Sequence, residues 1–173
     1  MISVVPHERI GELRLGMSPE QILAAIDMMR NQKIPLSNCE LETIVYQIND
    51  ITTIKYIDER FFFIVRYKNN RAIEIGIDQQ MSNCESVVLY NIDVFRTSAE
   101  RMISELKQHS AYHCDSTDEK LATNYYFKDI GIHLWREDAF HFKLLKNEKY
   151  LKKYGSLVTE KMQYLFFEVI YIF

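Results

Sequence analysis

Hydrophobic and polar residues alternate at the start of the chain and then change to a helical spacing. Residues 10–15 alternate as a short strand does. Ser18, Pro19 and Gln21 then follow in the order of an N-cap, a first-turn proline and a capping box. The apolar residues after them recur at helical spacing: Ile22, Ala25, Ile26 and Met29. This spacing predicts a helix over residues 19–30 with one buried face.

Extended segments rich in β-branched and aromatic residues come next. Residues 44–48, 51–57 and 60–67 are predicted strands, and residues 69–70, both asparagine, separate the last from residues 72–77. Because asparagine tolerates positive φ, this pair predicts a tight hairpin. Ile73, Ile75 and Ile77 of the last strand are expected to share one face of the sheet, which leaves the other face to solvent.

A second series of elements begins near residue 87. Residues 87–94 are a predicted strand, Thr97 begins a second capping-box sequence, and apolar spacing from Ala99 predicts a helix that ends near Gln108. A polar loop is expected over residues 110–123.

The remainder of the chain is predicted to hold a hairpin, a helix and a strand. The hairpin spans residues 125–135 and turns near residues 128–129. Asn147 is expected to cap a short helix that Gly155 ends in the left-handed conformation. The apolar tail from Met162 onward is predicted to be a final strand.

Both series run in the order strand, capped helix, hairpin. We therefore predict an α+β fold, with an antiparallel sheet that carries two main helices on one face. The shared order favours two degenerate helix–hairpin repeats over residues 1–80 and 86–173. Ordinary alternation within an α+β chain explains the same order, and both interpretations stay open. In either case we expect residues 1–173 to form a single domain.

Composition narrows the class of protein. Hydrophobic residues make up 47% of the chain and charged residues 26%, which is typical of a globular protein. The net charge of −3 gives no support for a nucleic-acid or membrane partner. The three cysteines, Cys39, Cys84 and Cys114, are widely spaced and odd in number, and the first residues lack the pattern of a secretory signal. These features predict free thiols and a cytoplasmic location.

No local catalytic motif is present in the sequence. It has no nucleophile elbow and no glycine-rich phosphate loop, so no cofactor is expected. His109 and His113 are four residues apart and Cys114 follows, but a metal site needs more ligands at suitable spacing, and none is expected. One enzymatic alternative stays open, which is a ligand-binding or hydrolytic site assembled from dispersed residues. Its candidates are His133, Glu137, Asp138 and His141.

The helix start at residues 10–22, Ile-Gly-Glu-Leu-Arg-Leu-Gly-Met-Ser-Pro-Glu-Gln-Ile, resembles that of several small bacterial α+β families. Among them are the β-lactamase inhibitor protein group, small lipoproteins of outer-membrane assembly, and cytosolic proteins that resemble immunity proteins encoded beside secreted toxins. The likeness is strongest over residues 10–27 and weaker over the hairpins at 60–77 and 124–136. Because the chain lacks a signal pattern and paired cysteines, the resemblance implies a cytosolic bacterial protein.

These observations lead to the hypothesis of a non-catalytic binding protein. The resemblance implies an immunity-type inhibitor, which would capture a toxin domain through the exposed sheet face or through acidic loops. Complementary charge would speed the encounter with a basic toxin. The candidate partner-binding residues are Asp115, Asp118, Glu119, Trp135, Glu137 and Asp138.

Overall fold

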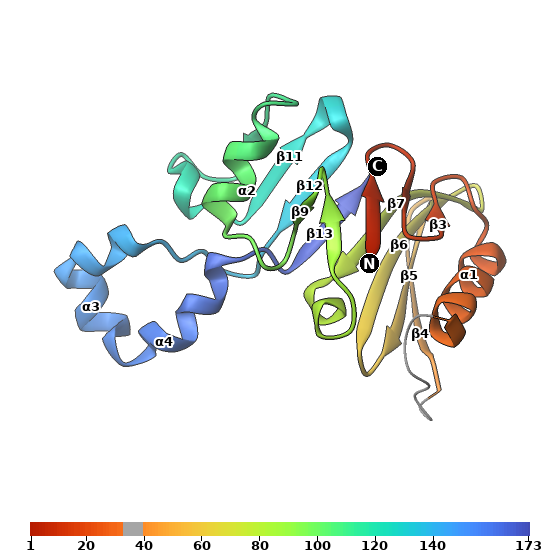
Figure 1. The fold of residues 1–173 in the computed structure, drawn as a ribbon, viewed down its shortest axis with the longest axis horizontal. Helices are drawn as coiled ribbons and strands as arrows, with labels where there is room; N and C mark the ends of the chain where they lie inside the picture. The colour runs from red at the N-terminus through yellow and green to blue at the C-terminus, as the bar shows by residue number, and fades with distance from the viewer. Residues whose placement is uncertain (33–39) are drawn as a thin grey trace.

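The computed structural model describes residues 1–32 and 40–173 (Figure 1). Helices and largely antiparallel sheets are mixed in it, so the predicted α+β class is confirmed. The larger sheet has eight strands in the order β10-β11-β12-β13-β7-β6-β5-β4, and all neighbours are antiparallel. Its strands are β4 (Glu42–Ile48), β5 (Ile51–Asp58), β6 (Phe61–Lys68), β7 (Arg71–Asp78), β10 (His113–Cys114), β11 (Asn124–Phe127), β12 (Ile132–Trp135) and β13 (Val169–Ile172).

A smaller sheet has five strands in the order β3-β2-β1-β8-β9. Its strands are β1 (Ile2–Val5), β2 (Arg9–Ile10), β3 (Leu13–Arg14), β8 (Val87–Leu89) and β9 (Ile92–Asp93). The first and second parts of the chain pair twice, because β1 lies parallel to β8 and β7 lies antiparallel to β13. Each sheet therefore contains strands from both parts of the chain.

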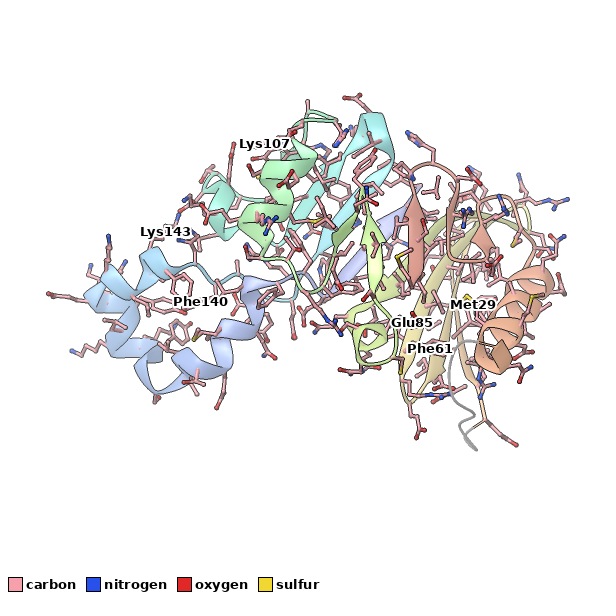
Figure 2. The ribbon with its side chains drawn as sticks, viewed as in Figure 1. Met29, Phe61, Glu85, Lys107, Phe140 and Lys143 are labelled. Carbon is pink, nitrogen blue, oxygen red and sulfur yellow. The ribbon has the colours of Figure 1, made fainter. Side chains whose placement is uncertain are left out.

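The hydrophobic core lies on one face of the larger sheet. Phe63, Ile77, Ile170 and Leu134 are successive cross-strand partners, and all four are buried. Helices α1 (Pro19–Gln32) and α2 (Ala99–Leu106) bury their apolar residues in the same cluster, so both helices cover this face. Met29 of α1 and Phe61 of β6, labelled in Figure 2, belong to this layer.

The first helix begins where the sequence predicts. The backbone N–H of Ser18 donates to Oε1 of Gln21 over 2.9 Å, and the backbone N–H of Gln21 lies 3.4 Å from Oγ of Ser18. This reciprocal pair confirms the capping box. The helix then continues to Gln32, two residues beyond the predicted end.

The second capping box was predicted wrongly. Helix α2 begins at Ala99 with Ser98 at the N-cap, one residue later than a box starting at Thr97 requires. The Ser98 side chain makes no capping hydrogen bond with any described residue. The helix also ends at Leu106, before the predicted Gln108.

Two segments predicted as single strands are hairpins. Tyr90 and Asn91 have φ angles of 50° and 64°, and this left-handed pair reverses the chain between β8 and β9. Gly11, with φ of 58°, likewise lies in the turn between β2 and β3. A period-two pattern cannot reveal such a turn when apolar residues continue on both sides of it.

The hairpin between β6 and β7 is confirmed, but one isoleucine of β7 does not lie on the predicted face. Asn69 and Asn70 adopt φ angles of 49° and 59°, as the predicted turn requires. The register shifts inside this hairpin, which makes Ile73 an extra residue on β7. As a result Ile73 is 42% exposed, whereas Ile75 and Ile77 are fully buried, so the prediction that all three share one face was wrong.

Between β12 and β13 the chain leaves the sheet as a series of short helices, which project from one end of the molecule (Figure 1). We call residues 142–165 the arm; it contains α3 (Glu148–Tyr154), α4 (Val158–Lys161) and three short 3-10 segments. All of the arm is described, and none of its helical residues is buried.

The arm corrects two predictions and confirms one. Asn147 caps α3 as predicted, since its Oδ1 accepts from the backbone N–H of Tyr150 over 3.1 Å. Gly155 has φ of −55° and continues into further helical turns, so the predicted left-handed ending is wrong. The final strand begins only at Val169, because residues from Met162 to Leu165 form a 3-10 turn.

Candidate functional site

One row of side chains crosses the outer face of the larger sheet, opposite the core. Each residue of this row is the cross-strand partner of the next. From β4 to β10 the row is Ile44, Lys55, Ile64, Gly76, Tyr171, His133, Tyr126 and His113.

The last four residues of the row form a stack of rings that we call the aromatic ladder. The centroids of His113 and Tyr126 are 4.9 Å apart, those of Tyr126 and His133 are 4.0 Å apart, and those of His133 and Tyr171 are 4.9 Å apart. Neighbouring planes differ by only 11–13°. The ring of Tyr171 continues the stack over Gly76, where a Cβ atom would overlap it. Glycine is thus required at this position by close approach rather than by backbone angle.

Stacking determines which atoms the ladder can offer to a partner. Tyr126 and His133 each have a ring on both sides, so their faces are covered. The edges carry tyrosine hydroxyl and imidazole nitrogen atoms: His113 is exposed and the two tyrosines are half-buried, whereas His133 is 9% exposed and its Nε2 is bonded to Asn124. The ladder therefore suits recognition by hydrogen bonds and edge contacts, and it offers little ring surface on which a planar ligand could stack.

His133 is held in the neutral state. Burial, and to a smaller degree the charge of Arg66, lowers its pKa to about 4. Its Nε2 lies 3.0 Å from Oδ1 of Asn124, and since that oxygen is an acceptor, we assign the hydrogen to Nε2. A neutral ring that is stacked on both faces and bonded at Nε2 is poorly placed to act as a general base.

The ladder borders a shallow cavity of about 590 Å³ on the same face. Arg66 and Glu74 form an ion pair of 2.8 Å along its side, and burial raises the pKa of Glu74. The cavity lining also includes Ile73 and Trp135, which is the only tryptophan in the sequence. Trp135, a sequence candidate, is thus partly exposed beside the ladder.

Asp115 has a structural role at the base of a hairpin. Its carboxylate accepts hydrogen bonds from the backbone and side chains of Thr123 and Asn124, at 2.5–3.2 Å. Partial burial acts to raise the pKa of Asp115, but these hydrogen bonds outweigh it and hold the pKa well below its usual range. The carboxylate is therefore engaged within the chain.

Three of the other acidic candidates, Asp118, Glu119 and Asp138, are also paired. Asp118 contacts Lys143, and Glu119 accepts from the hydroxyl of Tyr112 over 2.6 Å. Asp138 contacts Lys161. Glu119 lines a second cavity beside α2, whereas Trp135 lines the cavity of the outer face, so the structure does not gather the sequence candidates into one patch.

The four residues of the enzymatic alternative are also dispersed. His133 lines the outer-face cavity and His141 lines the cavity beside α2. Glu137 follows the end of β12, where its backbone N–H donates to the Glu168 carboxylate. Within residues 1–32 and 40–173, no three histidine, cysteine, aspartate or glutamate side chains are grouped as metal ligands.

His109 and His113 are held by separate aromatic partners. His109 stacks on Tyr90 with 4.0 Å between centroids, whereas His113 begins the ladder. Cys84 and Cys114 are free thiols, and Cys39 lies outside the described residues. In the part of the chain that the structure describes, no helix is long and apolar enough to span a membrane.

Sequence reasoning missed the ladder, although its components are visible. Tyr126 and His133 lie on strands that the sequence predicts, at positions that alternate with the apolar residues of the core face. Their contact depends on register, and the fourth ring, Tyr171, comes from β13, which the arm separates from β12 in the sequence. Compared with protein-family models, with curated proteins and with solved structures, the chain has no match.

Proposed function

We propose that this protein is a non-catalytic binding protein that holds a protein partner against the outer face of its larger sheet. The aromatic ladder is the observation that carries the proposal, since rings from four strands fix a row of hydroxyl and imidazole groups on one surface. Tyrosine is enriched where binding energy concentrates in protein interfaces. Rings already held by stacking also lose little side-chain entropy on binding.

The partner class that we infer is a toxin domain, as for an immunity-type inhibitor in the bacterial cytoplasm. The resemblance at residues 10–22 supports this class. The acidic loop at residues 115–119 supports it less than the ladder does, because its carboxylates are already engaged in contacts within the chain. An enzyme built from His133 and His141 has less support, because the two line different cavities.

The test replaces one ring of the ladder and compares it with a matched stack elsewhere. Tyr126→Ala should weaken binding to the toxin encoded beside this gene by about 30-fold or more, the effect of removing an interface hot spot. Fluorescence of Trp135 during titration measures the affinity, and survival on co-expression measures protection.

Tyr90→Ala is the control, because Tyr90 stacks on His109 at the turn of the smaller sheet, outside the ladder. It should leave both readouts unchanged. The proposal fails if Tyr126→Ala remains folded and protects as well as the unaltered protein, or if no neighbouring toxin binds at all.

A further inference from the structure

Arg136, the first residue after β12, is a buried charge. The residue is 1% exposed, and its guanidinium donates to three backbone carbonyl oxygens: Ala122 at 3.0 Å, Tyr164 at 2.7 Å and Lys120 at 3.1 Å. The rings of Tyr125 and Phe167 lie 6.0 and 5.7 Å from its central carbon. All of these partners are neutral.

Asp58, a second buried charge, has a different environment. Asp58 lies between Arg30 and Arg60, with N–O distances of 3.1 and 3.0 Å. Arg136 forms no ion pair with any described residue. Because burying an uncompensated charge is costly, proteins usually place an opposite charge beside it. The positive charge of Arg136 is solvated by dipoles but not neutralised.

A cavity of about 310 Å³, lined in part by Arg136, lies between α2 and the root of the arm. Its walls are mainly apolar and include Ile103 of α2 together with Phe140 and Phe142. Tyr125 and Arg136 also line it. Figure 2 labels Phe140 at the root of the arm and Lys107 at the end of α2, on the two sides of this region. Small-molecule sites typically have about this size and combine apolar walls with placed polar and charged groups.

The mouth of the cavity adds positive charge that a ligand could reach. Lys107 and Lys120 both line it, and each is paired with an exposed glutamate that also lines it, at 3.5 Å to Glu119 and 2.7 Å to Glu100. Exposed pairs of this kind contribute little stability, so they can exchange partners at low cost.

We propose that this cavity binds a small amphipathic carboxylate, whose apolar body lies along Ile103, Phe140 and Phe142 and whose carboxylate faces Arg136 and Lys120. A single negative charge matches the single buried positive charge. The contact of Nη2 with the Tyr125 hydroxyl, at 3.5 Å, is the weakest of the guanidinium contacts and is the one that the carboxylate would replace. A free phosphate would leave the apolar walls uncovered, so the lining favours an amphipathic ligand. The site is separate from the outer sheet face and does not depend on the proposed function.

The first experiment compares two ten-carbon probes that differ only in charge. Titration calorimetry and thermal unfolding are measured with decanoate and with decan-1-ol, below the concentration at which decanoate forms micelles. Decanoate is expected to bind at least 10-fold more tightly and to raise the melting temperature with concentration. Equal binding of the two probes would overturn the proposal, because it would show an apolar groove without charge recognition.

Variants then locate the binding. Ser104→Trp should abolish decanoate binding, because Ser104 lines the cavity from the exposed side of α2 and a larger side chain fills it. Arg101→Trp is the matched control, since Arg101 is exposed on the same helix but does not line the cavity. Lys120→Met should weaken decanoate binding several-fold and leave decan-1-ol binding unchanged.

Arg136→Met tests the buried charge directly, although its loss of three hydrogen bonds can prevent folding; Ser104→Trp and Lys120→Met keep the proposal testable in that case. Unchanged decanoate binding in Ser104→Trp would overturn the site. Tyr126→Ala should leave decanoate binding intact, so a failure of the sheet-face proposal and a failure of this one can be told apart.

Discussion

The two parts of the chain run through the same order of elements and build them differently. Before residue 80, short strands lead into the 14-residue helix α1 and then into four strands, β4 to β7, of seven or eight residues each. After residue 86, short strands lead into the eight-residue α2 and then into β10 to β13, which have two to four residues each. Repeats predict this shared order, and ordinary α+β alternation predicts it equally.

The two parts also differ in what they contribute: the first supplies long strands, and the second presents the groups that could bind a ligand or a partner. The first part supplies the long strands and the paired buried charge of Asp58. The second part supplies all four rings of the ladder, the unpaired charge of Arg136, and the arm. The arm holds six lysines and two glutamates, so it is positive although the chain carries a net charge of −3. Net charge therefore hides a local basic surface.

The largest contrast is expected between a core ring and an arm ring. Phe63→Ala should lower the free energy of unfolding by about 3–5 kcal/mol, because Phe63 is fully buried on the core face. Phe142→Ala should lower it by less than about 1 kcal/mol, since Phe142 is 51% exposed. Denaturant unfolding measures both. Similar losses in the two variants would contradict the division between a packed sheet and a coreless arm.

The buried charge of the first part is expected to act through pH. Burial acts to raise the pKa of Asp58, but hydrogen bonds and the charges of Arg60 and Arg30 outweigh it, so the pKa is lowered in the folded state. The resulting stability is present above the unfolded pKa, near 4, and is lost as pH falls through the lower folded value. Asp58→Asn should remove on the order of 2 kcal/mol at pH 7, the scale of hydrogen bonds to a charged group.

Melting temperatures at pH 7 and at pH 3 test the Asp58 prediction. The gap between Asp58→Asn and the unaltered protein should narrow at the lower pH. Glu85→Gln is a control, because among the described residues the Glu85 carboxylate pairs with the exposed N-terminal amine alone. If the gap for Asp58→Asn is the same at both pH values, its ionisation does not stabilise the fold.

The contact of Gly76 with Tyr171 joins the two parts of the chain. Gly76→Val should cost about 1–3 kcal/mol, because a side chain there would overlap the Tyr171 ring and displace the end of the ladder. Gly16→Ala is the comparison variant without a steric clash, because a Cβ atom at Gly16 would have no neighbour within 4 Å. Its φ of 83° still carries backbone strain for alanine. Near-ultraviolet circular dichroism reports the tyrosine stack. An unchanged spectrum in Gly76→Val would show that the rings do not depend on the glycine.

Sequence patterns predicted the elements whose signals are local. The helix at Pro19 and the turn at residues 69–70 depend on neighbouring residues, and both were found as predicted. The ladder and the cavity beside α2 depend on which strands pair and on where the arm leaves the sheet. Those contacts join residues far apart in sequence, such as His133 and Tyr171, so no local pattern encodes them. The acidic candidates were recognised as charged loops, but their internal partners could not be read from spacing.

The smallest predicted difference compares the two helix starts. Ser18→Ala should lower the free energy of unfolding by about 1 kcal/mol, because it removes the side-chain half of the capping box on α1. Ser98→Ala should change it by less than about 0.5 kcal/mol, since the Ser98 side chain caps no N–H among the described residues. Thermal melts of the two variants, measured side by side, are the test. Because both substitutions are Ser→Ala at an N-cap, changes in helix propensity largely cancel, and the difference isolates the capping hydrogen bond. Equal losses would mean that α2 is capped in solution by Ser98, and that the two helices start alike.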